Sequence, residues 1–429
     1  MSQIRKCCCG VDVHKTFLIA CIATFTNGKI KFSKKKRFST FSKGIREFKE
    51  WMRSENCFEI CMESTGKYWV PVYRIVSDDD FHVDIVHPKY VKAPWGKKND
   101  KKDAKRIAEM YLLDHIAEYS IVPSNEILAI RDICRYRRKT VQTMTAEKNR
   151  LSNCLTVSCI KLDEVLSDLY GKTGQALIEQ IIKCGDCNFD PTPYIDSRVK
   201  ASPEEFKLAL EGDVTPATLM KMRTISNHLD FLDKQKAELE QSMASLSEDF
   251  SHQLKLLDSA PGINSISAIS IISEIGDDMK VFGSVGKFLS WVGVVPQNNE
   301  SAGKKKSTRI AKGNSWLKPV IVQCANAAIK DKKHPEIREK YLELKKRRGH
   351  KKAIIAIAKR LLTAIYYMLL RDEVYRPHAG KETAHIRGKI EINRLITYYQ
   401  SKGYVITAGG EPVDSLKPLA TDDLLVAEG

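Results

Sequence analysis

The stretch that decides the fold of the first part of the chain is KCCCGVDVHKTFLIACIATFTNGKIKF, residues 6–32. Two runs in it, residues 7–14 and 16–25, are apolar and rich in β-branched and aromatic side chains, as buried strands are. Asn27-Gly28 separates the second run from KIKF, and an Asn-Gly pair between two strand-like runs is a strong signal for a hairpin. The segment therefore predicts three strands, the last two joined by a tight turn.

Outward from this hairpin, the pattern alternates between helices and strands. The further segments are a helix at 45–52, a strand at 57–64 that ends at Glu63, a helix at 67–76, a strand at 82–88 and a helix at 103–113. Helical spacing differs from the two-residue period of strands, and alternation of the two predicts helices packed on a sheet. We therefore expect an α/β domain over residues 1–120.

The middle of the chain has a helical pattern. Long helices are predicted at 125–165 and 215–257, and the second keeps apolar residues at three- and four-residue spacing. The residues of this seam are Ile225, Leu229, Leu232, Leu239, Met243, Leu246 and Phe250. Such a seam predicts a coiled-coil partner or a helical hairpin. We expect a helical coiled-coil region over 121–255, a mainly helical C-terminal domain over 256–372 and an extension over 373–429.

The charge of the chain favours a polyanionic partner. Its 429 residues carry a formal net charge of +17, and Lys and Arg that neutralise phosphates release counterions. An anionic membrane surface is the competing interpretation. However, no apolar run approaches the roughly 18 residues of a spanning helix, and no signal peptide is visible. We therefore expect nucleic acid rather than a membrane as partner, and a cytoplasmic, nucleoid-associated protein.

The twelve cysteines favour a reducing compartment. Most lie inside apolar segments, where a thiol packs as a small hydrophobic side chain. Cys184 and Cys187 have the spacing of metal ligands, but no second pair accompanies them, so a zinc site is disfavoured.

The basic segment KKNDKKDAKR, residues 97–106, contains two aspartates. On a helix, Asp100 and Asp103 fall on the same face as the apolar side chains of residues 104–111, while the lysines fall on the opposite face. A solvated charge run would mix the two kinds. The plainer interpretation, an N-cap at Asp100 and a dipole partner at Asp103, explains one carboxylate better than two.

Two more acids stand where strands end. Asp12 lies in an otherwise apolar strand, and Glu63 ends another. A lone buried carboxylate is costly, and several close together repel, so their joint ionisation needs a cation. Carboxylate oxygens suit Mg²⁺ or Mn²⁺, and two such ions can clamp the attacking and leaving oxygens of a phosphodiester. Asp, Glu and Asp-x-x-Asp on an α/β domain is a ribonuclease-H-like nuclease arrangement.

Six segments occur in an order that resembles a known family. They are GVDVHK, MESTGKYW, NDKKDAKRIAEM, APGINSISA, FLSWVGVVPQNNESAGKKKSTRIAKGN and KKAIIAIAKRLL. Over residues 8–118 and 256–371 the chain resembles the DEDD transposases of insertion-sequence family one hundred and ten, also called bridge-RNA-guided recombinases. The resemblance implies a RuvC-type, RNase H-like N-terminal domain whose four acids bind divalent metal. These acids are Asp12, Glu63, Asp100 and Asp103.

The resemblance also implies partners for this chain. Family members act as homo-oligomers, here a dimer or a tetramer, in which the serine of one protomer joins the acids of another. They cut and rejoin donor and target DNA through a covalent serine–DNA link. A structured guide RNA from the element pairs with both DNAs.

The serine that the resemblance assigns is Ser301, in the loop VGVVPQNNESAGKKKSTRI. Ala302-Gly303 would let a phosphate approach closely, and a hydroxyl needs activation before it attacks. The family usually has Ser-Gly where this chain has Ser-Ala-Gly, and Ser307 and Ser315 are rivals. The basic residues expected to bind phosphates are Lys97, Lys98, Lys101, Lys102, Lys304, Lys305, Lys306 and Arg309.

Four other features stay open at the sequence level. Asn264 replaces a family glycine, and we expect a modest effect, because a turn can tolerate Asn at positive φ. His14, beside Asp12, either touches DNA or is structural. The basic runs RDICRYRRK (131–139) and KKRRGHKK (345–352) are either nucleic-acid contacts or solvated faces.

The function expected from these residues is that of a metal-dependent insertion-sequence transposase that recombines DNA through a serine. One alternative is a metal-dependent Holliday-junction-type nuclease without serine chemistry. Another is a non-catalytic nucleic-acid-binding protein. Ser301→Ala separates the first two, because a plain nuclease would still cut DNA.

Overall fold

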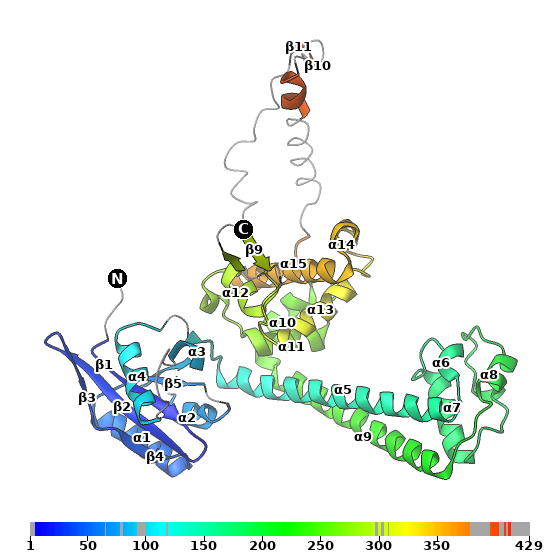
Figure 1. The fold of residues 1–429 in the computed structure, drawn as a ribbon, viewed down its shortest axis with the longest axis horizontal. Coiled ribbons are helices and arrows are strands. Elements are labelled where there is room, and N and C mark those ends of the chain that lie inside the picture. Colours follow the sequence, from blue (N-terminus) through cyan, green and yellow to red (C-terminus); the bar gives the residue numbers. More distant parts are fainter. Residues whose placement is uncertain are drawn as a thin grey trace. The chain divides into compact units, whose positions relative to one another are not determined.

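The computed structural model describes most of the chain, and it divides that chain into two compact units, Met1–Ala129 and Ile130–Gly429 (Figure 1). The described residues are 5–64, 66–77, 80–91, 100–116, 119–296, 299–301, 304–307, 309–377, 395–402, 407–408 and 411–412. Of these, residues 100–102, 299–301, 304–307, 407–408 and 411–412 are described by their backbone alone. The boundaries of the four expected domains stay a prediction.

Seven of the strands that the structure describes form one mixed sheet in the first unit. Their order is β3-β2-β1-β5-β6-β7, and β4 lies beside β2. They are β1 Cys7–Val13, β2 Phe17–Thr26, β3 Lys29–Phe32, β4 Lys36–Ser39, β5 Glu59–Glu63, β6 His82–Val86 and β7 Tyr119–Ser120. The first four pair antiparallel, whereas β1, β5 and β6 run parallel. The α/β prediction is confirmed in this coarse form.

The hairpin predicted at Asn27-Gly28 is confirmed. Both residues have positive φ, 53° and 74°, as the tight turn between antiparallel strands requires. The third strand expected from KIKFSKKKRF is in fact two strands, β3 and β4, which both pair with β2. Residues 33–35, a serine and two lysines, separate them.

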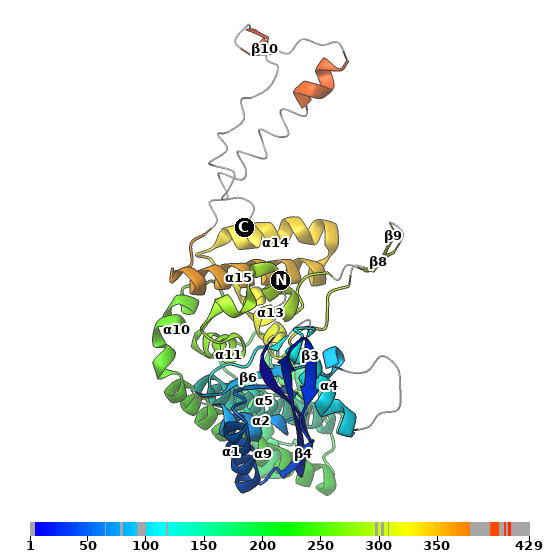
Figure 2. The ribbon, with the colours of Figure 1, turned by 90° about the vertical axis from the view of Figure 1, so that its left-hand side faces the viewer.

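Helices cover both faces of this sheet (Figure 2). They are α1 Ser42–Ser54, α2 Trp69–Val76, α3 Pro88–Val91 and α4 Asp100–Leu112. Phe48 of α1 and Val72 of α2 pack in one core with Val11 of β1. Ile107 and Tyr111 of α4 pack in a second core with residues that point to the other face, as alternate strand residues do.

The second unit begins with two long helices, which Figure 1 shows side by side. They are α5 Asn125–Val157, which crosses the unit boundary, and α9 Pro216–Leu246. Arg137 Nε donates to Glu240 Oε1 at 2.9 Å, and His228 Nδ1 lies 3.1 Å from Glu147 Oε1. These pairs tie α5 to α9 in an antiparallel hairpin, one of the two arrangements that the heptad seam predicted.

Both long helices end earlier than the sequence predicted. The helix expected over 125–165 stops at Val157, because Cys159 has a φ of 59° that no helix residue adopts. The helix expected over 215–257 stops at Leu246, where the buried Ser247 hydroxyl donates to Ala244 O. Of the predicted seam, Ile225, Leu232, Met243 and Phe250 are buried.

A small helical core closes the far end of this hairpin. It contains α6 Leu162–Val165, α7 Lys172–Cys184, the 3-10 turn η1 Thr192–Tyr194 and α8 Pro203–Ala209. Leu177, Phe206 and Met222 are buried together there. The sequence showed only a weak pattern over these residues, since the helices are short and separated by turns.

The remaining described helices lie in the C-terminal part. They are η2 Glu248–Phe250, α10 Ser251–Asp258, α11 Ser265–Ile275, η3 Met279–Phe282, α12 Val285–Val292, α13 Leu317–Ala328, α14 Pro335–Arg348 and α15 His350–Arg371. A helix over residues 395–400 and two short pairs of strands are also described: β8 Asn299–Ser301 with β9 Lys304–Ser307, and β10 Thr407–Ala408 with β11 Glu411–Pro412. The predicted mainly helical character of 256–372 is confirmed.

The statement that no apolar run reaches the length of a membrane span is wrong for α15. This helix has 22 residues and a mean hydropathy of 1.7 over its most apolar window. Its side chains Ile354, Leu361, Ile365 and Tyr366 are nevertheless buried within the protein, and the ring of Tyr366 packs on Phe288 of α12. Its apolar length therefore serves the core of this part.

All twelve cysteines are described, and all are free thiols. Eight of them are buried, which agrees with the expectation of core packing. Cys184 is exposed, and its Sγ accepts a hydrogen bond from Gln180 Nε2.

Candidate active site

The first two acids of the site stand on neighbouring parallel strands. Asp12 is the penultimate residue of β1, and Glu63 is the last residue of β5. Val11 pairs with Met62 in the parallel register, so the next step along both strands places Asp12 beside Glu63. The carboxyl ends of parallel strands meet at the same edge of a sheet, where loops leave room for a ligand.

Helix α4 reaches this edge because β1 carries a glycine. A Cβ on Gly10 would lie 2.2 Å from Ala108 N and 2.3 Å from Ala104 O. Only a residue without a side chain lets the helix backbone approach so closely. The contact sets the first turn of α4, with Asp103, next to Asp12. Sequence reasoning missed this role, although an isolated Gly in an apolar strand is a signal for close approach.

The carboxyl group of Asp12 is the electrostatic centre of the site. Asp12 is 6% exposed, and burial raises its pKa above the ordinary range. The neighbouring charges of Glu63 and Asp103 raise the pKa further, while His14 opposes the rise. His14 Nε2 lies 3.1 Å from Asp12 Oδ2, and its ring packs against Phe17. The partner of Asp12 in this structure is therefore His14.

The orientation predicted for α4 is confirmed where its side chains are described. Ala104, Ile107, Ala108 and Tyr111 are buried, whereas Lys105 is exposed. Asp103, half-buried, lies at the edge of the buried face. Asp100 begins the helix, but its side chain lies outside the described residues, as do those of Lys101 and Lys102. Lys97 and Lys98 lie outside them entirely.

The donor set suits a hard divalent cation. Asp12, Glu63 and Asp103 offer carboxylate oxygens, the ligands that Mg²⁺ prefers. Burial is the main cause of the raised pKa of Asp12, and a nearby cation would favour its charged form. Among the side chains that the structure describes, no three ligands yet form a metal-binding group. The residues fit a metal by their chemistry.

The predicted serine lies in the other unit, at the turn of a β-hairpin. Ser301 ends β8 and pairs with Lys304, the first residue of β9. Ser307 lies at the opposite end of the hairpin, paired with Asn299. Ser315 lies beyond the hairpin, where its carbonyl oxygen accepts from Arg138 Nη1. Of the three serines, Ser301 stands at the tip.

The basic residues of this loop fall on β9 and just after it. Lys304, Lys305 and Lys306 belong to β9, and their side chains lie outside the described residues. Arg309 follows the strand and is exposed. The nucleic-acid contacts assigned to them stay a prediction.

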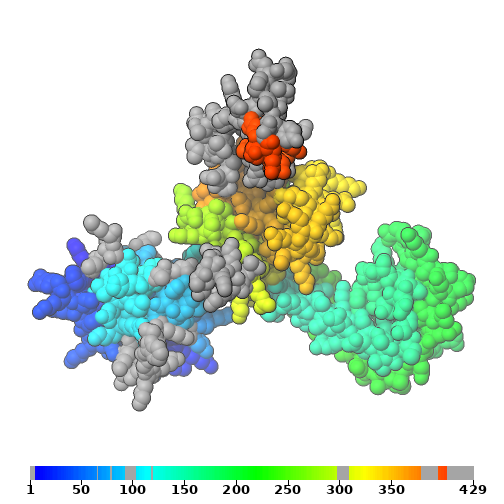
Figure 3. All heavy atoms as spheres, turned by 45° about the horizontal axis from the view of Figure 1, so that its top comes forward, coloured from blue at the N-terminus to red at the C-terminus, as the bar shows by residue number. Residues whose placement is uncertain are grey.

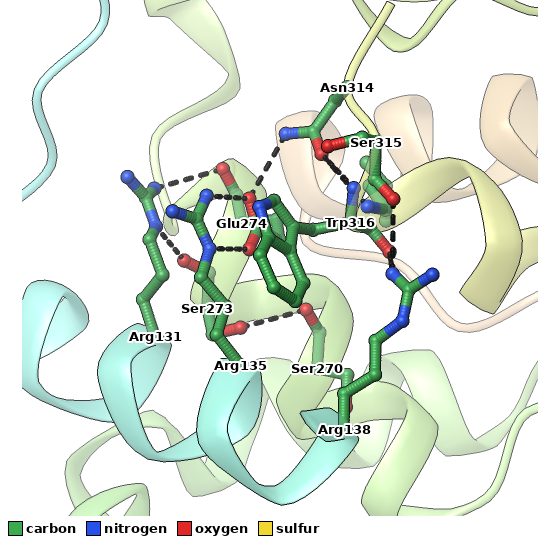
Figure 4. A network of polar contacts seen from close by, with 10 residues as sticks. Arg131, Arg135, Arg138, Ser270, Ser273, Glu274, Asn314, Ser315 and Trp316 are labelled. Carbon is green, nitrogen blue, oxygen red and sulfur yellow. Dashed lines mark hydrogen bonds and ion pairs between the residues drawn. The ribbon is translucent and has the colours of Figure 1, made fainter. Parts of the chain in front are cut away.

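The basic run RDICRYRRK is bound inside the protein (Figure 4). Arg131 donates to Ser273 O and Glu274 O, and Arg135 binds both carboxylate oxygens of Glu274. Arg138 donates to the carbonyl oxygens of Ser315 and Trp316. The three guanidinium groups thus have partners within the protein, and a nucleic-acid contact of this run stays a prediction. Their guanidinium groups join α5 to α11 and to the start of α13.

The basic run KKRRGHKK keeps its side chains exposed, from Lys345 to Lys352. It forms the corner between α14 and α15, and Figure 3 shows α14, in yellow-orange, at the surface of its unit. Gly349 makes the corner with a φ of 76°. The charge of this corner is compatible with either interpretation of the run.

Asn264 does not adopt a positive φ in this structure. Its φ is −115°, and it caps α11 by accepting a hydrogen bond from Ser267 N at 2.9 Å. The positive φ of this turn belongs to Gly262, at 75°. A Cβ there would lie 2.3 Å from Cys324 O, so the preceding glycine takes the strained position and Asn264 is free to act as a cap.

The acids at the strand ends and on α4 agree with the DEDD arrangement that the resemblance implies. A family model of DEDD transposases, described as a transposase, matches residues 9–160, and one described as "Transposase IS116/IS110/IS902 family" matches residues 254–342. The transposase for insertion sequence element IS1111A of Coxiella burnetii is 24% identical over 382 residues, which cover 86% of this chain and 90% of that protein.

The chain belongs to the IS110 family of insertion-sequence transposases. The resemblance recognised in the sequence is thereby confirmed, and the protein is an enzyme, a DNA transposase. The first matched region contains all four predicted acids, and the second contains Ser301. A DEDD transposase domain implies a requirement for a divalent metal, which agrees with the carboxylate chemistry at the edge of the sheet.

Proposed function

We propose that this transposase cuts and rejoins DNA with a metal site on the first unit and a serine nucleophile on the second. The observation that carries the proposal is the gathering of Asp12, Glu63 and Asp103 at one edge of the sheet, in a chain of this family. The order of antiparallel and parallel strands, with acids at strand ends, supports an RNase H-like, RuvC-type fold for the first unit.

Four side chains would hold the metal: Asp12, Glu63, Asp100 and Asp103. A bound Mg²⁺ or Mn²⁺ would supply Lewis-acid stabilisation of the charge that develops on a phosphodiester. The protein's own contribution is to hold Asp12 in a buried strand and to bring Asp103 to it through the glycine contact of α4. His14 would keep the Asp12 carboxylate oriented through its hydrogen bond.

The covalent step begins at Ser301. Its Oγ forms a bond to phosphorus, and the bond from phosphorus to one deoxyribose oxygen breaks. The hydroxyl proton leaves with the solvent or a carboxylate, and the departing oxygen takes up a proton. The product is a serine–DNA phosphodiester and a free DNA hydroxyl. A hydroxyl of a second strand reverses the step and releases the serine, so no external energy source is needed.

Basic residues would hold the DNA backbone at both halves of the site. Lys97, Lys98, Lys101 and Lys102 flank the acids, and Lys304, Lys305, Lys306 and Arg309 follow the serine. Charge-assisted bonds from such residues fix phosphate position without reading the sequence. Sequence choice would come from a structured guide RNA that pairs with donor and target DNA.

The serine step is tested by trapping the protein–DNA adduct. Wild-type protein with element RNA, supercoiled DNA and Mg²⁺ is expected to give a denaturation-resistant adduct, and Ser301→Ala is expected to abolish it. Ser307→Ala is the matched control and is expected to keep it. Strand cutting by Ser301→Ala at the wild-type rate would instead identify a Holliday-junction-type nuclease that uses the acids alone.

The guide is tested by sequencing the RNA that copurifies with the protein from cells carrying the whole element. One element-encoded RNA in stoichiometric amount is the expected result. A random sample of cellular RNA would contradict guidance, while leaving the metal and serine chemistry untouched.

A further inference from the structure

The two ends of the segment that carries Ser301 touch each other at their base. The segment leaves α12 at Gly293 and returns at Gly313, both with positive φ. A Cβ on Gly313 would lie 2.2 Å from Val292 O, so the outgoing and returning ends of the segment are in backbone contact. A bridge between Pro296 and Ile310 continues the contact outward. Figure 2 shows β8 and β9 standing out from the helices of the unit above this base.

Asn314 fixes the returning end of the segment. Its backbone N donates to Trp291 O at 3.1 Å, which ties it to α12. Its Oδ1 accepts from Trp316 N at 2.8 Å and Leu317 N at 2.9 Å, and so starts α13. Lys318 adds a third tie, because its Nζ donates to Ala311 O at 2.8 Å. One residue thus joins the end of the segment to two helices.

The remaining group of Asn314, its side-chain amide, points at a buried carboxylate (Figure 4). Nδ2 donates to Glu274 Oε2 at 3.0 Å. Only 4% of the Glu274 side chain is exposed, and both of its oxygens accept from Arg135, at 2.8 and 2.9 Å. A planar guanidinium that binds a carboxylate through two parallel bonds fixes its plane as well as its position.

The group of Arg135, Glu274 and Asn314 is called the anchor below. The aromatic ring of Trp316 packs beside it. The guanidinium carbons of Arg135 and Arg138 lie 5.0 and 5.2 Å from its centroid. Arg138 also donates to the carbonyl oxygen of Trp316. A buried ion pair adds little net stability against apolar residues of the same size, but it enforces one geometry. An ion pair of this kind is suited to fixing the position of a segment rather than to stabilising the fold.

We infer that Arg135, Glu274 and Asn314 are positioning residues, which hold the base of the Ser301 hairpin in the placement required for attack on DNA. None of them touches the reacting atoms. They act through the base of the segment, because Asn314 ties its returning end to α12 and to the start of α13. The inference rests on the proposed serine chemistry. Misplacing a reacting group by about 1 Å can cost on the order of 100-fold in rate.

The test exchanges the side-chain amide of Asn314 and the carboxylate of Glu274. Asn314→Asp keeps the oxygen that starts α13 but puts a second carboxylate against Glu274. The expected result is a 10- to 100-fold slower formation of the Ser301–DNA adduct at saturating DNA, with unchanged DNA affinity, by analogy with roughly 100-fold losses on misplacement. Adding Glu274→Gln restores one carboxylate and one amide, in exchanged positions. This double variant is expected to regain most of the lost rate.

The matched control is Glu240→Gln, which breaks a second arginine–carboxylate pair of α5 far from the hairpin in sequence, and it is expected to keep the wild-type rate. A wild-type rate in Asn314→Asp, or a double variant as slow as its singles, would overturn the inference. If Asn314→Asp does not fold, Glu274→Gln and the double variant carry the same comparison. Absence of any Ser301-dependent adduct in the wild type would overturn the proposed function instead.

Discussion

At the scale of single residues, Asp12 is an acid whose burial opposes its ionisation. Its carboxyl group is buried beside two others and has one neutralising neighbour, His14. Burial raises its pKa, so the folded chain favours the protonated form more than the unfolded chain does. Ionisation at neutral pH therefore opposes folding until a cation binds.

Asp12→Asn is expected to raise the thermal unfolding midpoint of the metal-free protein at neutral pH while abolishing DNA cutting. The stability that protonation gives Asp12 is complete below the ordinary pKa of aspartate, about 3.9. It is lost as the pH rises through the higher folded value. The advantage of the variant should therefore grow from acid to neutral pH in thermal melts with EDTA. A lower midpoint at neutral pH would contradict the cost assigned to the buried charge.

At the scale of elements, the packing of α4 on β1 depends on one missing side chain. Gly10→Ala places a Cβ within 2.3 Å of two α4 backbone atoms, and backbone cannot turn aside as a long side chain can. We expect a loss of about 2–3 kcal/mol in unfolding free energy, measured by urea denaturation. DNA cutting should fall further than stability explains, because the shift of α4 moves Asp103.

Gly286→Ala is the control for this substitution. A Cβ there meets only Ser284 Oγ, at 3.9 Å, and Gly286 lies in helix α12 without a positive φ. We expect its stability to be unchanged or up to about 1 kcal/mol greater. Equal losses of unfolding free energy in Gly10→Ala and Gly286→Ala would contradict the claim that α4 packs too close to Gly10 for a Cβ.

The cap of α11 gives a second prediction at this scale. Asn264→Ala removes the acceptor for Ser267 N and should cost about 1 kcal/mol, whereas Asn264→Gly should cost only a few tenths. Urea midpoints of the two variants measure the difference. A variant with glycine, the usual residue of the family, that is more stable than wild type would indicate a positive φ at this position, against the −115° observed.

The elements that sequence predicted best are those whose pattern is local. The hairpin at Asn27-Gly28, the strand ending at Glu63 and the apolar face of α4 follow from spacing alone, and the structure has all three. The same spacing could not end α5 at Val157 or α9 at Leu246. Those ends depend on Cys159 and Ser247, single residues in positions that no periodicity marks.

The same distinction between local pattern and distant contacts applies to the candidate functional residues. Asp12, Glu63 and Asp103 were found because acids in apolar strands and on an apolar helix face violate the local pattern. The partners of the α5 arginines within the protein were not predicted, since Glu274, Ser315 and Trp316 lie more than a hundred residues away. Charge alone does not distinguish an arginine that binds a buried glutamate from one that is available to bind phosphate.

At the scale of the whole molecule, the acids and the serine belong to different compact units. The proposed chemistry needs both, and the family resemblance implies that one protomer supplies the acids and another the serine. Mixed oligomers test this arrangement. Asp12→Asn and Ser301→Ala proteins are each expected to be inactive alone. Mixed during assembly, they should recover a measurable fraction of strand transfer, because some sites then join intact acids to an intact serine.

A mixture of Asp12→Asn with Asp103→Asn proteins is the control, and it should stay inactive. Both lesions lie in the acid half, so every composite site lacks one carboxylate however the protomers combine. Copurification through different affinity tags would establish that mixed oligomers form in both cases. Mixed oligomers of Asp12→Asn and Ser301→Ala that transfer no strands would contradict a site shared between protomers and require each chain to use its own serine.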